Sequence, residues 1–590
     1  MGQQTLDALK QEQLLLVLRQ MKDRYSIVFF SLALCLSSTL FAQTTQTTLD
    51  YDDRVHPELA QNFMVVSQNH HSTDAGYLIL KQGGNAVDAA VAVGFSLAVT
   101  LPRAGNIGGG GFMLIYSADS QNVSAIDYRS AAPVAATSEM FLTESGVVRF
   151  GHLVNAVPGS VAGLLKAHKK YGKLSLKEVL KPAIELASKG FPVPHDLNHV
   201  LDWAKGSMLD NSASRKKFYN SKDKPLPIAS IFTQPKLART LNLIANKGSE
   251  AFYEGEIADW IVRDSIANGG LITKQDLANY TAKERLPIES FYRGHKIVSM
   301  SPAASGGIVL LQILNILENF DMTRLGHNSA SSIHLLSEAM LRAYSDRMKY
   351  HGDPDFFKVP VDGLLNKDYA KDRAESIYLN KKTPDKDIFP GKVPIIDESP
   401  DTTHFSIIDS NGNAVSNTYT LGSSFGSGVT VPEGGFLLNN QMRNFSHLYG
   451  KSDELSLSTS AANKLEPGKR MISTQTPTLV FNPEGDLMMV LGSPGGGRIP
   501  NIIAQVISNV IDHDLGFAEA VMAPRINQRV GKNLELESGF SPDTIELLKA
   551  KGHYPKPSTT MGSVQAIFLS QGYIHGVSDT RRPGAKAKGN

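Results

Sequence analysis

The sequence predicts a mixed α/β fold, because strand-like and helix-like stretches both recur along the chain. Strand-like runs of apolar residues lie at 112–116, 123–128 and 487–491. Helical spacing of apolar residues dominates the region from 160 to 390. The helices expected there and before it are 74–82, 86–100, 174–188, 234–247, 257–267, 307–318 and 331–350, and one more is expected at 502–511.

The composition is that of an ordinary globular protein, with 42% hydrophobic and 20% charged residues. The 59 Lys and Arg residues exceed the 57 Asp and Glu residues by two, so the net charge of +2 does not favour a nucleic-acid partner. The glycines at 108–111 lack the Gly-Lys-Ser/Thr of a phosphate loop, and no cofactor is expected. The basic tail, 581–590, is expected to be disordered.

Residues 1–42 have the features of a secretory signal peptide. Lys22 and Arg24 precede an apolar run, 27–42, that ends at the small residue Ala42. The run is too short for a stable transmembrane helix, so the mature protein is expected to be periplasmic or secreted, and Met21 is a possible true start. The single cysteine, Cys35, lies in this leader, which leaves no cysteine for a disulfide or for thiol catalysis.

The stretch 401–412 organises the rest of the chain. Residues 403–408 alternate as a strand, and Ser410-Asn411-Gly412 is typical of a three-residue hairpin loop with Gly in the left-handed position. This loop pairs residues whose numbers sum to 822, which places Thr402 opposite Thr420. A two-residue Asn-Gly turn would instead shift the register by one residue and separate the two threonines.

Two threonines at the open end of a hairpin have two interpretations. The first is ordinary cross-strand pairing. The second is an N-terminal threonine nucleophile, whose hydroxyl needs a base that the α-amine of the same residue can supply at neutral pH. That chemistry requires a cut between Asp401 and Thr402. The Pro- and Asp-rich segment 384–400 is loop-like and suits a cleavable junction.

Further motifs follow the hairpin and precede it. After it come Thr418-Tyr419-Thr420, Leu438-Asn439-Asn440-Gln441-Met442, Gly468-Lys469-Arg470 and 491–498, which reads LGSPGGGR. Before it lie the segments 79–90, 104–113, 125–129, 157–163 and 344–347. Together these motifs resemble the γ-glutamyltranspeptidase family of N-terminal-nucleophile hydrolases, over nearly the whole chain after the leader.

The resemblance implies a four-layer αββα sandwich built jointly by two subunits of one zymogen. The large subunit would span 43–401 and the small catalytic subunit 402–590, so the mature protein would be a heterodimer. The implied activity is γ-glutamyl hydrolysis and transfer, with glutathione and other γ-glutamyl amides as donors. Water, an amino acid or a dipeptide would accept the glutamyl group from an ester on Thr402, without a metal or cofactor.

The resemblance also assigns roles to individual residues. Thr402 would be the nucleophile, Thr420 would orient its hydroxyl, and the backbone N–H groups of Gly495 and Gly496 would hold the oxyanion. The residues implied in binding the glutamyl head are Arg129, Ser473 and Thr474 for the α-carboxylate, Gln441 and Asn444 for the α-amine, and Thr420 and Gly422 beside them.

Two departures from the family pattern concern the substrate's ammonium group. Gly422 stands where the family commonly has Asn, and Asn444 stands where it commonly has Asp. Arg443 adds a positive charge next to Asn444. Because a charge-assisted hydrogen bond is about twice as strong as a neutral one, these changes keep a glutaryl or cephalosporin acylase open as an alternative. Thr474, in place of a family Ser, retains the hydroxyl.

Other classes of function are weaker interpretations. An uncleaved secreted binding protein would keep the fold without the chemistry. Gly422-Ser423-Ser424-Phe425-Gly426 matches the G-x-S-x-G motif of serine esterases, but no sturdy helix is expected after it. His195 and His199 have the spacing of a zinc-protease motif, but it has Asp in place of the catalytic Glu, so a solvated helix start is expected there.

Overall fold

The computed structural model describes residues 53–144, 146–388, 402–448 and 460–590. The expected signal peptide, Asp401 and most of the expected loop 384–400 lie outside the described residues. Among the helices that are described, none has the length and apolar character needed to cross a membrane.

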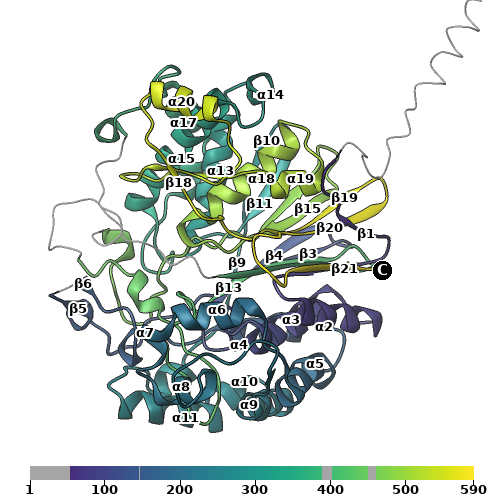
Figure 1. Cartoon of the computed structure of the whole chain (residues 1–590), viewed down its shortest axis with the longest axis vertical. Coiled ribbons are helices and arrows are strands. Elements are labelled where there is room, and N and C mark those ends of the chain that lie inside the picture. Colours follow the sequence, from purple (N-terminus) through teal and green to yellow (C-terminus); the bar gives the residue numbers. More distant parts are fainter. Residues whose placement is uncertain (1–52, 145, 389–401, 449–459) are drawn as a thin grey trace, which may run out of the picture. The chain divides into compact units, whose positions relative to one another are not determined.

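Two antiparallel sheets of seven strands each form the centre of the fold (Figure 1). The first has the order β21 (Lys586–Gly589), β2 (Met64–Ser67), β12 (Thr403–Ile408), β13 (Ala414–Thr420), β3 (Gly110–Ser117), β4 (Asn122–Tyr128), β9 (Lys283–Arg285). The second has the order β1 (Glu58–Ala60), β20 (Tyr573–Ser578), β19 (Gln565–Ser570), β15 (Leu487–Gly492), β14 (Thr478–Phe481), β11 (His295–Ser299), β10 (Ile288–Tyr292).

The two sheets pack face to face. Apolar side chains of both sheets, among them Phe112, Leu114, Leu479 and Val490, form one buried cluster between them. Ser406 on β12 also donates a hydrogen bond to the main-chain oxygen of Gln565 in the opposite sheet, at 3.0 Å. The strand alternation predicted from the sequence therefore separates an inter-sheet face from an outer face.

Helices cover both outer faces, as Figure 1 shows. Phe405 and Ile407 of β12 pack into a core with α3 (Ala86–Thr100), while Met489 and Leu491 of β15 pack with helices on the other side. The long helices are α2 (His70–Lys81), α3, α4 (Ser160–Tyr171), α5 (Leu176–Lys189), α9 (Pro235–Lys247), α11 (Glu256–Ala267), α13 (Ser305–Leu317), α15 (Ala330–Tyr350) and α18 (Ile499–Ile511). The expected αββα sandwich is confirmed.

Shorter elements complete the described chain. The helices are α6 (His195–Trp203), α7 (Lys205–Met208), α8 (Ser212–Phe218), α10 (Ser249–Tyr253), α12 (Lys274–Ala278), α14 (Met322–Leu325), α16 (Val361–Leu365), α17 (Lys367–Glu375), α19 (Phe517–Met522) and α20 (Pro542–Ala550). The strands of three small sheets are β5 (Leu142–Thr143), β6 (Gly146–Val147), β7 (Phe191–Pro192), β8 (Ile231–Phe232), β16 (Ile526–Asn527), β17 (Leu534–Leu536) and β18 (Pro555–Pro557).

The prediction of a disordered C-terminal tail is wrong. Residues 586–589 form β21, which pairs with β2 and is the edge strand of its sheet. Lys586 and Lys588 form ion pairs with Asp74 at 3.1 and 2.7 Å, and Arg581 pairs with Glu537 at 2.7 Å. The basic side chains that suggested a solvated tail instead attach it to the fold.

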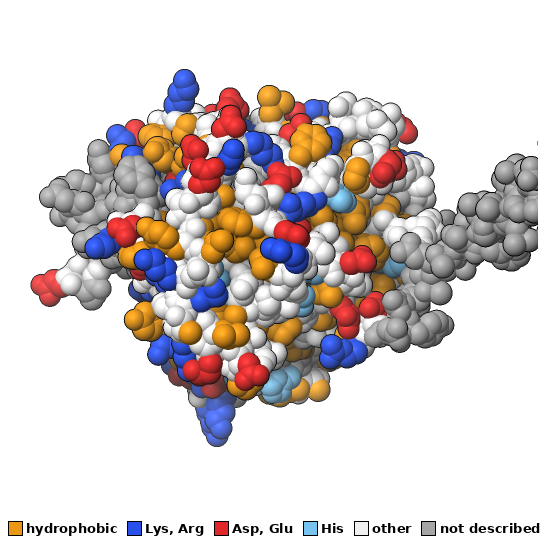
Figure 2. Space-filling model, turned by 90° about the horizontal axis from the view of Figure 1, so that it is seen from above, with side chains coloured by type: hydrophobic (Ala, Val, Ile, Leu, Met, Phe, Trp, Pro, Cys, Tyr) orange, Lys and Arg blue, Asp and Glu red, His pale blue; other side chains and the backbone are white. Residues whose placement is uncertain are grey.

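Positive and negative side chains are interspersed on the face of the molecule shown in Figure 2. This distribution agrees with the small net charge of +2.

Candidate active site

Thr402 lies directly before β12 and is 7% exposed. The register of the hairpin is the predicted one, because Thr403 pairs with Tyr419 and Ile408 with Ala414. The amide of Gly412, with φ +81°, donates to the main-chain oxygen of Asp409 at 3.0 Å and closes the three-residue loop. Extending this register by one residue places Thr402 opposite Thr420 at the open end.

A cavity of about 30 Å³ lies at this open end, and we refer to it as the Thr402 cavity. Its volume suits one or two water molecules. Eight of the residues singled out in the sequence line it: Arg129, Thr402, Thr420, Gly422, Asn444, Ser473, Thr474 and Gly496. Arg443 and Gln475 complete the lining, whereas Gly495 and Gln441 do not line it. The fold thus brings together segments that are far apart in the sequence.

Arg129 follows β4 and is completely buried, so it is not the surface ion pair that an isolated arginine would suggest. Its Nε donates to the main-chain oxygen of Met471 at 3.2 Å, and its Nη2 donates to that of Ile472 at 3.4 Å. Its amide donates to Asp127 Oδ1 at 3.0 Å. These bonds fix the guanidinium group beside Ser473.

Asp127 connects Arg129 to a buried charge network. Its Oδ2 accepts hydrogen bonds from Arg470 at 3.0 Å and from Arg285 at 3.3 Å. The amide of Arg470 in turn donates to Asp353. Burial raises the pKa of the Asp353 carboxyl above its usual range. The main chain that carries Arg129 is therefore held by several charged groups that do not line the cavity.

A glycine turn joins β15 to α18. Gly495 has φ +144° and Gly496 has φ +54°, which is the region of backbone conformation that favours glycine. Thr474 Oγ1 donates to the main-chain oxygen of Gly496 at 2.9 Å. The Thr474 hydroxyl therefore ties the segment 473–475 to the turn whose amides were predicted to hold the oxyanion.

Gly422 has a structural reason to be glycine. Its φ is +103°, and a Cβ atom added here would lie 2.2 Å from Oδ1 of Asn440. Asn440 is held in place because its Oδ1 accepts a hydrogen bond from the amide of Ser423 at 2.8 Å. The Gly422 amide donates to Thr420 Oγ1 at 2.9 Å, so this turn also positions the Thr420 hydroxyl.

Gln441 lies behind the cavity. Its Nε2 donates to the main-chain oxygen of Thr420 at 2.8 Å, and its Oε1 is buried without a hydrogen-bond partner among the described residues. The side chain therefore supports the end of β13. In these contacts it does not reach the position expected for a substrate amine.

Arg443 lines the cavity, and the sequence had indicated its positive charge beside Asn444, whereas Gln475 is a lining residue that no motif singled out. Arg443 Nη1 donates to Ser423 Oγ at 2.9 Å. The main-chain oxygen of its neighbour Asn444 accepts a hydrogen bond from Asn463 at 2.7 Å. The lining contains two guanidinium groups and no carboxylate, so the Thr402 cavity favours anionic groups.

His404 is an imidazole close to Thr402 in sequence, but its ring lies between the sheets. Its Nδ1 is 2.8 Å from Thr418 Oγ1 and its Nε2 is 3.0 Å from Ser406 Oγ. Burial lowers the pKa of His404 to about 3. The ring is neutral at pH 7 and does not line the cavity, so it adds no positive charge to the site.

Neither the G-x-S-x-G motif at 422–426 nor the histidine pair at 195 and 199 has the structure that its alternative function requires. The described residues directly after 422–426 form turns and not a helix, and Ser424 does not line the Thr402 cavity. His195 begins α6, and the two histidine rings of that motif stack 6.2 Å apart. Among the described residues, the group of three that could hold a metal ion lies elsewhere, at His334, Glu338 and His553.

Known proteins are similar to this chain over most of its length. The family model described as Gamma-glutamyltranspeptidase matches residues 72–589. A glutathione hydrolase proenzyme of Escherichia coli (strain K12) is 46% identical over 537 residues, which cover 90% of this chain and 92% of the relative. An acylase ACY 1 proenzyme of Pseudomonas sp. (strain SE83) is 37% identical over 550 residues, which cover 91% and 95%.

A solved structure extends the comparison to three dimensions. The cephalosporin acylase from Bacillus halodurans superposes with a TM-score of 0.80 at 28% identity, covering 93% of this chain and 99% of that one. The extent of the family match and the identity to the relatives lead to one conclusion: the chain belongs to the γ-glutamyltranspeptidase family.

Proposed function

We propose that this protein is a self-cleaving γ-glutamyl hydrolase and transferase with Thr402 as its nucleophile. The observation that carries the proposal is the Thr402 cavity, where the nucleophile candidate, Arg129 and the glycine turn at 496 meet. The expected donors are glutathione and other γ-glutamyl amides.

In the proposed reaction, cleavage between Asp401 and Thr402 first frees the α-amine of Thr402. That amine takes the proton of the Thr402 hydroxyl while the oxygen attacks the γ-carbonyl carbon. Amides of the 495–496 turn stabilise the oxyanion. The amine then returns the proton to the leaving amine, and a γ-glutamyl ester remains on Thr402. Water, an amino acid or a dipeptide breaks the ester.

The binding roles follow the charges of the cavity. Arg129 forms hydrogen bonds to the α-carboxylate of the glutamyl group, aided by the hydroxyls of Ser473 and Thr474. Thr420, whose hydroxyl is fixed by the Gly422 amide, orients the nucleophile. Asn444 accepts a hydrogen bond from the α-ammonium, while Gln441 supports the strand behind it.

A pair of variants tests the nucleophile. Thr402→Ala removes the hydroxyl, and we expect a single uncut chain on a denaturing gel with no measurable activity. The matched variant Thr402→Ser keeps a hydroxyl and should still be cut, with slower turnover. If the Ala variant still splits at 401/402 or retains activity, Thr402 is not the nucleophile; retained activity would favour a serine esterase.

One specific observation favours a second candidate, a glutaryl- or cephalosporin-type acylase with the same nucleophile. The cavity lining contains Arg443 and Asn444 and no carboxylate that would pair with an ammonium, and a 37% identical relative is named an acylase. Measuring kcat/KM on γ-glutamyl-p-nitroanilide and on glutaryl-p-nitroanilide decides between them. A preference for the γ-glutamyl compound supports the first candidate, and an equal or reversed preference supports the acylase.

We also propose that the protein acts in the periplasm or outside the cell, with residues 1–42 removed and subunits 43–401 and 402–590 held together. Mass determination of the mature protein checks both the removal of residues 1–42 and the cut between residues 401 and 402. An intact leader, or one uncut chain, would contradict this part of the proposal, and an uncut inactive chain would favour the binding-protein alternative.

A further inference from the structure

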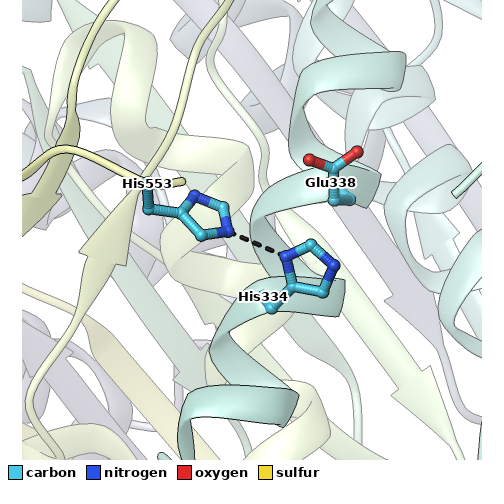
Figure 3. A group of neighbouring side chains, drawn as sticks. All are labelled: His334, Glu338 and His553. Atoms are coloured by element: carbon cyan, nitrogen blue, oxygen red, sulfur yellow. Dashed lines mark hydrogen bonds between the residues drawn. The ribbon is translucent and has the colours of Figure 1, made fainter. Parts of the chain in front are cut away.

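His334, Glu338 and His553 form a buried cluster that the proposed reaction does not use. His334 and Glu338 lie one turn apart on α15, and His553 lies just after α20 (Figure 3). One nitrogen of each histidine and a carboxylate oxygen lie within 4.8 Å of one another. None of the three lines the Thr402 cavity, so the cluster needs its own explanation.

The two histidines are oriented toward a common point. His334 Nε2 donates to the main-chain oxygen of Tyr378 at 2.7 Å, which leaves the lone pair of the neutral ring on Nδ1. This Nδ1 is 2.8 Å from His553 Nε2. A ring N–H held by a main-chain oxygen is the usual arrangement around a metal-binding histidine, because it fixes the tautomer and the ring orientation.

A metal ion binds the neutral form of imidazole, and both rings are buried. The remaining nitrogen of His553, Nδ1, is buried without a partner among the described residues. It can carry the ring proton when Nε2 acts as a ligand.

Glu338 has lone pairs available despite its two hydrogen bonds. Its Oε2 accepts from Arg342 at 2.7 Å, and its Oε1 accepts from the amide of Thr383 at 3.0 Å. An ionised carboxylate offers about four lone-pair positions. Each oxygen therefore keeps a lone pair that can coordinate an ion.

We propose that His334, Glu338 and His553 bind one divalent transition-metal ion, and that Zn²⁺ fits best. Two nitrogens and one oxygen are a usual zinc set, with bonds of about 2.0–2.2 Å in tetrahedral geometry. Ligand atoms are then about 3.3 Å apart, so the two rings separate slightly from 2.8 Å and Glu338 moves inward.

The charges around the cluster determine which ions it can accept. Arg342, Lys382 and Lys551 act on these histidines as positive charges, and they oppose a cation held by charge alone. Ca²⁺ and Mg²⁺ depend on several oxygen ligands, whereas Zn²⁺ gains from imidazole nitrogen. The cluster is therefore expected to select Zn²⁺ over both.

The ion would join the two proposed subunits, and this consequence rests on the proposed cleavage. His334 and Glu338 precede residue 401, whereas His553 follows it. The segment near residue 383 is already attached to both sides, because Thr383 donates to Glu338 and Lys382 donates its amide to the main-chain oxygen of Lys551 at 2.6 Å. A bound ion would add a cross-link there.

Zinc titration of the full chain as expressed and processed tests the site. The protein is first treated with a chelator, and ZnCl₂ is then added. Metal analysis should find about one bound Zn²⁺ per pair of large and small subunits. The melting temperature should rise by about 2 °C at zinc concentrations near 100 Kd. Co²⁺ in the same site should give the visible absorption of a tetrahedral complex, while CaCl₂ should change neither readout.

Variants locate the ion. His553→Gln and Glu338→Gln should lose the bound zinc and the thermal shift. His513→Gln is the matched control, because His513 and His327 form another ring pair, 5.4 Å apart, outside the cluster. The control should bind zinc like the original chain.

Three results would overturn the proposal: no bound zinc in the original chain, equal zinc in His553→Gln, or loss of zinc in the His513 control. Self-cleavage and activity of each variant serve as folding checks, since the cluster does not line the Thr402 cavity. The uncut Thr402→Ala chain should bind zinc as well, so a failure of the proposed cleavage remains distinguishable from a failure of the metal site.

Discussion

The two sides of the Thr402 cavity differ in how firmly the charges are fixed. On one side, Arg129 is completely buried and its guanidinium donates to two main-chain oxygens. On the other side, Arg443 is only half-buried and donates to the hydroxyl of Ser423, next to Gly422 and the neutral Asn444. The first side is built for a carboxylate, and the second lacks the negative charge that an ammonium prefers. Under the proposed function, the site would therefore specify an acyl group with a terminal carboxylate more strongly than the amine beside it.

The largest effect should come from the fixed side. Arg129→Lys keeps the charge but loses the planar fork of donors and leaves two buried main-chain oxygens without their present donors. We expect kcat/KM for γ-glutamyl-p-nitroanilide to fall about 100-fold, or about 3 kcal/mol, as expected when a charged hydrogen-bonded contact is lost.

Arg293→Lys is the control for that loss. Arg293 also donates to a main-chain oxygen, that of Glu318, but does not line the cavity. Its replacement should leave kcat/KM near the original value. An unchanged kcat/KM in Arg129→Lys would mean that the carboxylate binds elsewhere and that the contrast between the two sides is wrong.

The second prediction tests whether arginines alone make the cavity positive. His404 is buried with its pKa lowered to about 3, whereas an unfolded histidine titrates near 6.5. Between these values the unfolded chain binds more protons than the folded one, so stability falls as pH decreases. From pH 7 to pH 5 this one group should lower the free energy of unfolding by about 2 kcal/mol.

Urea unfolding of the uncut Thr402→Ala chain, with and without the second substitution, measures the effect at pH 7 and pH 5. The decrease between the two pH values should be about 2 kcal/mol smaller with His404→Gln than without it. Replacement of the exposed His56 by Gln should not change the decrease. A His404 variant with the original pH dependence would show that the folded ring takes up a proton as an unfolded histidine does. The ring would then be charged at pH 5, and the charge comparison of the two sides would need a third group.

The smallest effect should come from the second side. Asn444→Asp restores a carboxylate, which can form a charge-assisted hydrogen bond to the substrate's ammonium. We expect the ratio of kcat/KM for the γ-glutamyl over the glutaryl p-nitroanilide to rise about 10-fold, or about 1.4 kcal/mol. Asn482→Asp, in the turn between β14 and β15, should leave the ratio unchanged. A ratio that stays constant in the Asn444 variant would place the ammonium away from residue 444.

The sequence was sufficient for the parts of the site that local rules determine. The hairpin register follows from one turn, because Gly412 takes the left-handed conformation that a three-residue loop requires. The αββα fold and the convergence on Thr402 came from the resemblance, since periodicity within a segment does not reveal which segments meet.

Features set by distant contacts could not be predicted in this way. The sequence indicated a positive charge at Arg443, but not the hydrogen bond to Ser423, twenty residues earlier, that this side chain forms. The cluster at 334, 338 and 553 forms where α15 meets the chain just after α20, and the two histidines are 219 residues apart in sequence. The C-terminal residues look solvated in composition, yet they become the edge strand beside β2. In each case the deciding partner is far away in sequence.

The place of β12 in its sheet has a consequence for how the mature protein unfolds on heating. β12 begins one residue after the proposed cut and lies between β2 and β13, so each subunit lacks part of the sheet without the other. The two pieces then have no separate folded states, and dilution alone should not release either of them. Once heat unfolds the mature protein, recovery would require two different chains to meet again. Processing would therefore convert a chain that could refold alone into one whose working lifetime is governed by its rate of unfolding.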